Sequence, residues 1–427
     1  MAEGAGDDPY DVTPHNEGST AVFDVLKGLR SVEGSAFVAA PSGGMMLAQL
    51  GADVIRFDQI GGGIDHDRWP VTPEGRSMYW TGLNKGKRSF AVALRVERGR
   101  ELCAELVCAP GDGAGIFLSN FPARGWMSYE SLKARRDDLI MVNIKGNRDG
   151  TTAVDYTVNC AVGYPFVTGP DSSASPANHV LPAWDVICGQ MTALGLLAAE
   201  RTRSREGSGQ LVEIALADVA MWTVAMLGHI AEAQINREER SRIGNDMYGA
   251  FGRDFVTKEG RRVMAVAISF KQWQSLLDAM GLQEKMKRVE ELLEADFRRE
   301  GDRFEHRAVI GSVMEPWFLH HTVDQIRAAF DARSVCWGPY QTFSQLGDED
   351  PRCSIENPMF QMVDQPGIGR YLMAGPPLDF GGAARGEVAP APVLGEHTEQ
   401  ILAEELGLPS AETGELHDAG VVAGPEY

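Results

Sequence analysis

Short apolar strands alternate with helix-forming segments through the first 145 residues, and this alternation limits the folds that the chain can adopt. The predicted strands are residues 29–33, 53–57, 89–94, 115–119 and 138–144. A helix is predicted at 39–50, because Pro41 lies near its first turn and Gly51 follows its end. A second helix is predicted at 101–107. Strands that alternate with helices favour a parallel, doubly wound sheet with helices on both faces.

The texture of the sequence changes after residue 233, beyond a predicted strand at 211–214 and a long predicted helix at 217–233. Glycine-rich turns, a strand at 262–268 and charged amphipathic helices at 283–297 and 321–332 indicate a smaller α+β domain. The predicted organisation is a disordered segment at 1–19, a large domain at 20–233, the small domain at 234–350, and a return to the large domain with a C-terminal segment at 351–427.

Composition excludes several classes of protein. The formal net charge of −20 argues against nucleic acid as a partner, because phosphate binding needs a basic surface. No apolar run approaches the roughly 20 residues that span a bilayer, so no membrane partner is expected. The first 19 residues are acidic and polar and have no apolar core, so they are not expected to be a signal peptide. Six cysteines without CxxC spacing or a histidine cluster predict a reducing cytoplasm and no metal site.

Asp185 is the candidate of greatest interest for chemistry. It follows a loop rich in Pro, Ser and Asn (169–182) and precedes an apolar run that extends to Arg201. This places a carboxylate at the start of a long helix, where free N–H groups and the helix dipole favour an anion. Such an aspartate is ionised at pH 7 and can act as a nucleophile. Position alone favours the alternative of an ordinary helix N-cap.

Six segments in order resemble the class III CoA-transferase family (CaiB/BaiF type), which also contains the α-methylacyl-CoA racemases. They are GADVIR at 51–56, LNKGKRS at 83–89, NFP at 120–122, PAWDVICG at 182–189, RTRSREGSGQ at 201–210 and LGEHT at 394–398. Asp185 stands ten residues before Gly195 of a GLLAA run, the spacing of the family's catalytic aspartate. The resemblance therefore implies that Asp185 is the nucleophile.

The resemblance also implies a site for coenzyme A, which is anionic at its phosphates and neutral along its pantetheine arm. The residues at matching positions are Val38, Ala39, Arg68, Lys87, Arg88, Arg95, Asn120, Phe121, Arg124 and Lys145. Arginine and lysine suit the phosphates, and backbone groups suit the arm. The alternative for each basic residue is a solvated surface charge, and Arg95 and Lys145 are favoured most. No cofactor beyond the CoA of the substrate, and no metal, is expected.

A departure from the family separates two reactions. Racemases of the family exchange a proton between an aspartate and a histidine in an HDxNY-like element. The matching stretch here is VDYTVN at 154–159, so Val154 occupies the histidine position. Valine cannot move a proton. The nearest histidine in sequence, His179, falls in the loop before Asp185 and could face the site, but we interpret it as a loop residue or an orienting donor and not as the missing base. The departure favours CoA transfer, in which a carboxylate attacks the thioester, over racemisation.

Finer features resemble one branch of the family, which moves CoA within a single molecule from the first to the fourth carbon of mesaconate in 3-hydroxypropionate-type carbon assimilation. The segments concerned are 32–41, 120–126, 152–159 and 242–255. The last of these, with Asn245 and Tyr248, is a candidate for binding the free carboxylate or else a structural turn. Alternatives are an intermolecular transferase for another short dicarboxylic acid, a racemase, and a silent CoA-binding paralogue.

The family resemblance implies an architecture as well as a reaction. The expected fold is a doubly wound parallel-sheet large domain with an inserted smaller α+β domain. The expected assembly is an interlocked homodimer, in which the two chains thread through one another. The expected partners are therefore an acyl-CoA substrate and a second copy of the chain.

Overall fold

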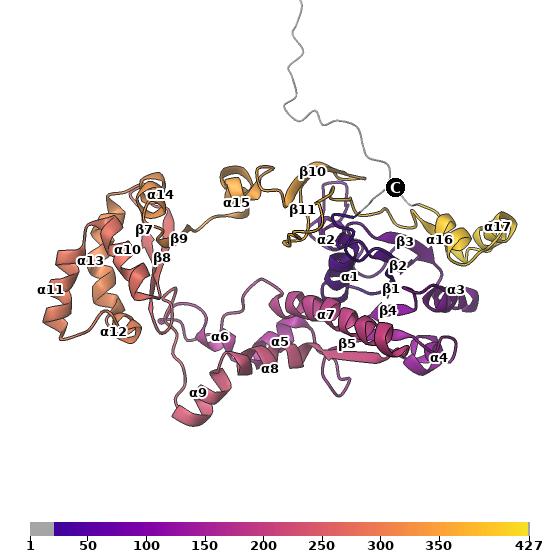
Figure 1. The fold of residues 1–427 in the computed structure, drawn as a ribbon, viewed down its shortest axis with the longest axis horizontal. Coiled ribbons are helices and arrows are strands. Elements are labelled where there is room, and N and C mark those ends of the chain that lie inside the picture. The colour runs from indigo at the N-terminus through magenta and orange to yellow at the C-terminus, as the bar shows by residue number, and fades with distance from the viewer. Residues whose placement is uncertain (1–20, 426–427) are drawn as a thin grey trace, which may run out of the picture. The chain divides into compact units, whose positions relative to one another are not determined.

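The computed structural model describes residues 21–425, so the segment predicted to be disordered, 1–19, lies outside the described residues. Two compact units make up the chain (Figure 1). The first contains residues 21–155, 182–220 and 351–425, and the second contains 156–181 and 221–350. The first unit is thus built from both ends of the chain. The exact domain limits given above stay a prediction.

A seven-stranded sheet forms the centre of the first unit. Its strands are β1 (Arg30–Gly34), β2 (Asp53–Gln59), β3 (Arg88–Val92), β4 (Ile116–Ser119), β5 (Ile140–Lys145), β6 (Leu211–Ala215) and β12 (Val422–Ala423), in the order β12-β3-β2-β1-β4-β5-β6. All neighbours are parallel except β12, which runs antiparallel to β3. The predicted parallel sheet is confirmed. The chain winds outward on both sides of β1 and β4, and such a switch point opens a crevice at the carboxyl ends of the strands.

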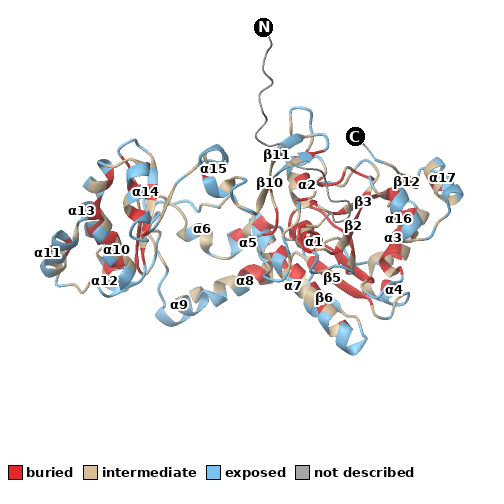
Figure 2. Ribbon diagram, turned by 45° about the horizontal axis from the view of Figure 1, so that its top comes forward, coloured by how far each residue is buried: buried red, intermediate tan, exposed pale blue. Residues whose placement is uncertain are grey.

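Helices cover both faces of this sheet. The helices of the first unit are α1 (Ala39–Gln49), α2 (Met78–Leu83), α3 (Glu97–Cys108), α4 (Tyr129–Lys133), α7 (Ala183–Glu206), α16 (Thr398–Glu404) and α17 (Ser410–Asp418). Helices α3, α4, α16 and α17 share one apolar core with the strands, which are the most buried part of this unit (Figure 2). Helices α1 and α7 pack against each other so closely that a Cβ on Gly189 would lie 2.0 Å from Ser42 Oγ. A residue larger than glycine there would force the two helices apart.

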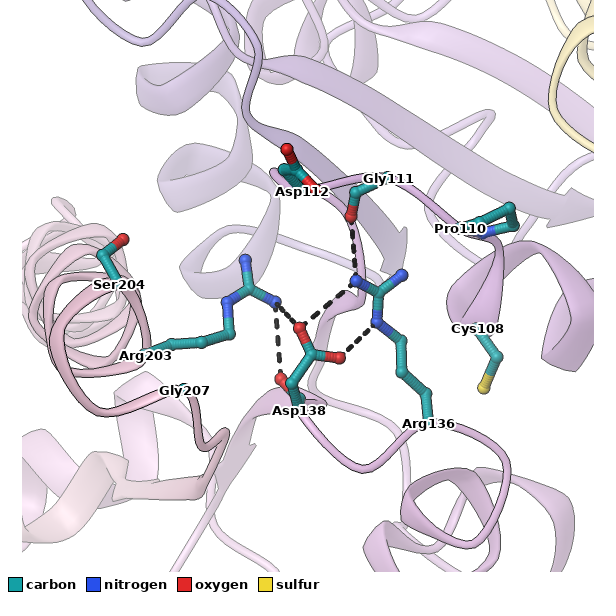
Figure 3. A pocket seen from close by; sticks show the side chains of 9 residues that line it. All are labelled: Cys108, Pro110, Gly111, Asp112, Arg136, Asp138, Arg203, Ser204 and Gly207. Atoms are coloured by element: carbon teal, nitrogen blue, oxygen red, sulfur yellow. Dashed lines mark hydrogen bonds and ion pairs between the residues drawn. The ribbon is translucent and has the colours of Figure 1, made fainter.

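The far end of α7 is tied to the sheet by arginine residues. Arg203 Nη1 donates to the carbonyl of Ala114 at 2.7 Å and lies 3.6 Å from the Asp138 carboxylate. Arg136 binds the same carboxylate at 2.7 Å and the carbonyl of Gly111 at 2.9 Å (Figure 3). These groups line a cavity of about 490 Å³ beside the starts of β4 and β5. Their mutual pairing indicates a structural role, because most of the guanidinium, carboxylate and carbonyl groups bind one another, and of these described groups only Arg203 Nη2 is buried without a partner.

The second unit is an α+β domain around a three-stranded antiparallel sheet. Its main elements are β7 (Phe251–Val256), β8 (Arg262–Ala267), β9 (Cys336–Pro339), α10 (Phe270–Met280), α11 (Gln283–Leu293), α12 (Glu300–Glu305), α13 (Arg307–Leu319) and α14 (Val323–Asp331). Aromatic rings fill its core, with Phe255 and Phe318 stacked at 4.1 Å. Capping boxes start α10 at Ser269 and α14 at Thr322. The predicted α+β character is confirmed.

The remaining elements lie outside the two main sheets and the helices named above. They are α5 (Asp155–Ala161), α6 (Tyr164–Val167), α8 (Leu216–Met226), α9 (His229–Asn236), α15 (Phe343–Glu349), the hairpin β10 (Phe360–Gln365) with β11 (Gly369–Ala374), and the short 3₁₀ turns Gly125–Met127 and Pro351–Cys353. The single helix predicted at 217–233 is wrong. Gly228 has a φ of 80° and separates α8 from α9, because a left-handed residue cannot continue a right-handed helix.

Candidate active site

Loops that follow β1, β2 and β4 meet at the switch point of the sheet. Asn120, just after β4, accepts a hydrogen bond from the Ala36 N–H at 3.0 Å and donates to the Ala36 carbonyl at 2.7 Å. Phe37 has a φ of 67°, a left-handed conformation that is costly for a bulky residue. The Asp65 carboxylate accepts its N–H at 2.8 Å and thereby holds it there. Backbone strain that the surroundings impose in this way is common at functional sites.

Asp185 lies in the first turn of α7, at the same edge of the sheet. Pro182 occupies the N-cap position of α7, and its side chain makes no capping hydrogen bond. The interpretation of Asp185 as an ordinary N-cap is therefore wrong. The capping group is Asp155, whose Oδ2 accepts the N–H groups of Trp184 at 2.8 Å and of Asp185 at 3.1 Å. This leaves the Asp185 side chain free of the task of capping and available for chemistry.

Burial makes the Asp185 carboxylate more basic than an ordinary aspartate. Desolvation, and secondarily the charge of Asp155, raise the pKa of Asp185 to about 6. The sequence-based expectation that Asp185 is ionised at pH 7 still holds for a carboxyl with this pKa, which is roughly nine-tenths ionised there. A poorly solvated carboxylate is a better nucleophile than one in water, because less hydration is lost on attack.

Tyr79 feels the charge of Asp185, and Arg68 lies beside Tyr79. The guanidinium of Arg68 lies 5.4 Å from the ring centre of Phe37 and 5.4 Å from that of Tyr79. Burial raises the pKa of Tyr79, the charge of Arg68 opposes this, and the charges of Asp185 and Asp65 raise it further. Sequence reasoning did not identify Tyr79 or Asp155, although Asp155 stands in the VDYTVN element. Tyr79 lies five residues before the LNKGKRS element's Asn84, and nothing in its spacing marks it.

Most residues of the predicted CoA site lie at the carboxyl edge of the sheet. Val38 and Ala39 follow β1, Arg68 follows β2, Arg95 follows β3, Asn120, Phe121 and Arg124 follow β4, and Lys145 ends β5. Arg95 and Arg124 are exposed and make no ion pair with any residue in 21–425. Lys145 Nζ pairs with Glu213 at 2.8 Å. The structure thus places several cations along one edge of the sheet, and an anionic ligand needs cations.

Lys87 and Arg88 are placed differently. Lys87 is buried, and its Nζ donates to Glu33 at 2.8 Å, to Asn84 at 2.9 Å and to the carbonyl of Pro41 at 3.0 Å. These acceptors occupy its three N–H groups, and burial lowers its pKa to about 8. Arg88 binds Asp53, the first residue of β2, at 2.9 Å through Nε, and also pairs with Glu405. Contact of these two with CoA stays a prediction.

Two further observations concern the described part of the chain. Residues 21–425 contain no group of three or more His, Cys, Asp or Glu side chains placed to hold a metal ion. Within the same range, no helix combines the length and the apolar character needed to cross a bilayer. The six cysteines are free thiols.

A buried carboxylate at the start of a helix, at the carboxyl edge of a doubly wound sheet, agrees with the match to known proteins. Residues 26–398 match the model of CoA-transferase family III. The match covers most of the chain, and the protein therefore belongs to CoA-transferase family III.

Individual relatives show which members of the family the chain resembles. The chain is 57% identical over 403 residues to the 2-methylfumaryl-CoA isomerase of Chloroflexus aurantiacus, and the alignment covers 94% of this chain and 98% of that one. It is 27% identical to the succinyl-CoA:mesaconate CoA-transferase of Haloarcula hispanica, with 89% and 96% covered. A CaiB/BaiF family protein from Brucella suis has a similar crystal structure, with a TM-score of 0.73, 26% identity, and 89% and 98% of the two chains covered.

Proposed function

We propose that this protein is an intramolecular CoA transferase that acts on mesaconyl-CoA (2-methylfumaryl-CoA) and moves CoA from the first to the fourth carbon. The observation that carries this proposal is the 57% identity, along nearly the whole of both chains, to a 2-methylfumaryl-CoA isomerase. A dicarboxylic acid with one thioester suits such a reaction, because the free carboxylate is itself the acceptor.

The proposed first half-reaction transfers CoA to the enzyme. A carboxylate oxygen of Asp185 attacks the thioester carbonyl carbon, the carbon–sulfur bond breaks, and CoA leaves as a thiolate. The product is a mixed anhydride between Asp185 and the acid. The thiolate then attacks the aspartyl carbonyl carbon and breaks the anhydride carbon–oxygen bond. Asp185 now carries CoA as a thioester, and the acid is free as a dicarboxylate.

The second half-reaction repeats these steps with the other end of the acid. The fourth-carbon carboxylate attacks the aspartyl thioester, forms a new anhydride and expels the thiolate. The thiolate attacks the fourth carbon and releases the Asp185 carboxylate. Thioester replaces thioester throughout, so the protein has mainly to position the groups and exclude water, which would hydrolyse the anhydride. The burial of Asp185 serves both needs.

For CoA we propose the cations and loops at the carboxyl edge. Arg95, Arg124 and Lys145 are the proposed phosphate contacts, because they follow or end β3, β4 and β5 at the carboxyl edge of the sheet, where Arg95 and Arg124 are exposed and Lys145 is partly exposed. Val38 and Ala39, with Asn120 and Phe121, are the proposed contacts of the pantetheine arm. The proposal needs no cofactor beyond the CoA that the substrate carries.

Two of the alternatives, a racemase and an intermolecular transferase, are weighed by different observations. A racemase needs a second proton-transfer group, and Val154, whose side chain is 55% exposed, offers none. An intermolecular transferase is favoured by the resemblance to the succinyl-CoA:mesaconate CoA-transferase, at the lower identity of 27%. The difference between transfer within one molecule and transfer between two is therefore the point that an experiment must decide.

We further propose that the protein works as a homodimer with interlocked chains. Large apolar side chains are exposed along α8 and α9, where Trp222 is 50% exposed and Ile235 is 78% exposed. The others are Met221, Met226, Leu227 and Ile230. An exposed apolar surface of this kind indicates a partner, and a second copy of the chain would cover it.

The experiment that tests the function uses purified protein, mesaconyl-CoA esterified at the first carbon, and isotopically labelled free mesaconate. Chromatography and mass spectrometry follow the position of the thioester and the label. We expect the fourth-carbon thioester without label. Label in the thioester would instead indicate an intermolecular transferase. Absence of any transfer would exclude this acyl group, and chiral 2-methylacyl-CoA would then test racemisation.

A further inference from the structure

Arg68 is an arginine without a carboxylate partner beside the candidate active site. No Asp or Glu among residues 21–425 forms an ion pair with it, whereas the neighbouring Arg56 is fully buried and binds Asp58 at 2.8 Å and Asp65 at 3.2 Å. The Arg68 side chain is held instead by two aromatic rings, Phe37 and Tyr79, each 5.4 Å from its guanidinium carbon. Stacking of this kind orients the planar guanidinium, which also donates a hydrogen bond to the Tyr79 hydroxyl, and its remaining N–H groups are available for a ligand.

Packing of α1 on α7 places this group near Asp185. Ala39, two residues after Phe37, has its carbonyl oxygen 2.8 Å from the Cβ position of Gly189. Gly189 lies one helical turn after Asp185 in α7. The charge of Asp185 also reaches Tyr79, whose pKa it raises. The strained backbone of Phe37, fixed by Asp65, sets the position of one ring of the pair.

We propose that Arg68 binds the free carboxylate of the dicarboxylic monothioester, and that the flat, conjugated acid lies against the rings of Phe37 and Tyr79. This inference rests on the function proposed above. It assigns Arg68 a different ligand from the CoA contact that its position in the family implies. A guanidinium binds a carboxylate through two parallel hydrogen bonds, and a conjugated acid presents a flat face to an aromatic ring.

The reaction gives this assignment a consequence. When one carboxyl carbon of mesaconate is bonded at Asp185, the other carboxylate needs a cation. After CoA has moved to Asp185, the free acid has to turn end for end before its second carboxylate can attack. Arg68 would hold one carboxylate before the turn and the other after it. Retention of the acid between the half-reactions, which makes the transfer intramolecular, would then depend on Arg68.

Binding measurements separate this role from a CoA contact. In the unreactive Asp185→Asn background, calorimetry would compare CoA with mesaconyl-CoA, with and without Arg68→Gln. We expect Arg68→Gln to weaken mesaconyl-CoA binding about 10- to 100-fold, the usual effect of losing a charged hydrogen-bonding pair, and to leave CoA binding unchanged. Arg68→Lys keeps the positive charge but loses the two parallel N–H donors of the guanidinium, so it should weaken mesaconyl-CoA binding less than Arg68→Gln does. Equal weakening of CoA and mesaconyl-CoA, or no weakening of either, would overturn the proposal.

A labelling experiment tests retention directly. With Asp185 intact, Arg68→Gln should admit labelled free mesaconate into the thioester that it forms, whereas the wild type should not. The matched control is Arg298→Gln, an exposed arginine of the second unit whose loss should leave the labelling pattern unchanged. Wild-type protein that does not isomerise mesaconyl-CoA would overturn the proposed function. Wild-type protein that isomerises, with the same label exclusion in Arg68→Gln, would overturn the role of Arg68 alone.

Discussion

The arginines of the cavity beside β4 and β5 differ from Arg68 in how the protein pairs them. At the amino ends of β4 and β5, the guanidinium groups of Arg203 and Arg136 share the Asp138 carboxylate and neighbouring carbonyls (Figure 3). At the carboxyl edge, Arg68 has only aromatic neighbours, and the Asp185 carboxylate is buried with a raised pKa. Charges satisfied within the protein hold the fold together. Charges that the protein leaves unsatisfied are available to a substrate.

The largest expected effect comes from removing the Asp185 carboxylate at the carboxyl edge of the sheet. Replacing Asp185 by Ala removes the nucleophile and should reduce kcat about 10⁴-fold or more, because no other group can form the covalent intermediate. Steady-state assays with mesaconyl-CoA measure kcat, and calorimetry with CoA should show binding that is unchanged. Activity that survives the substitution would contradict the assignment of the nucleophile.

The second prediction concerns the paired arginines at the amino ends of β4 and β5. Arg203→Ala removes a guanidinium that is 5% exposed and leaves Asp138 and the Ala114 carbonyl with fewer donors. We expect the free energy of unfolding to fall by about 3 kcal/mol, as for other broken buried pairs. Urea denaturation measures this, and the remaining folded enzyme should keep its KM. The matched control is Arg201→Ala, an exposed arginine of the same helix, which should change stability little.

A third prediction concerns the loss of folding stability that results from burying the charged Asp185 carboxylate. The pKa of Asp185 is raised to about 6 in the folded protein from its ordinary 3.8, so the folded state binds its proton more tightly than the unfolded state does. Stability should therefore fall as pH rises between these values and stay lower above pH 6. Asp185→Asn removes the buried charge and should raise the free energy of unfolding at pH 7 by about 2 kcal/mol. Equal stability of the two proteins at pH 7 would contradict this.

The smallest expected effect distinguishes the electrostatic role of Asp155 from its role as a helix cap. Asp155→Asn keeps an oxygen that can accept the N–H groups of Trp184 and Asp185 but removes the charge that helps raise the pKa of Asp185. The acid limb of the kcat/KM profile, expected near pH 6, should therefore move to lower pH. Asp155→Ala should in addition lose about 1 kcal/mol of stability with the cap. An acid limb that does not move in Asp155→Asn would limit Asp155 to a structural role.

Local sequence patterns were sufficient for many elements of the large unit, but α2, α4, α17 and β12 were not predicted. The predicted helix at 39–50 is found as α1 (Ala39–Gln49), and the strand at 211–214 as β6 (Leu211–Ala215). These elements are marked by local features, namely hydrophobic periodicity, a proline near a helix start and a glycine after its end. Such features can be recognised in the sequence without knowledge of the fold. The prediction failed at 217–233, where apolar residues continue through Gly228 and conceal the break between α8 and α9.

The candidate site divides in the same way. The sequence by itself determined the sheet class, the family and the position of Asp185, because these are written in residue order and spacing. Only the tertiary structure decided that Asp155 caps α7, that Lys87 is buried on Glu33, and that Arg68 lies between two rings. Such contacts join residues that stand far apart in the chain. Burial and charge then follow from packing, and packing has no local signature in the sequence.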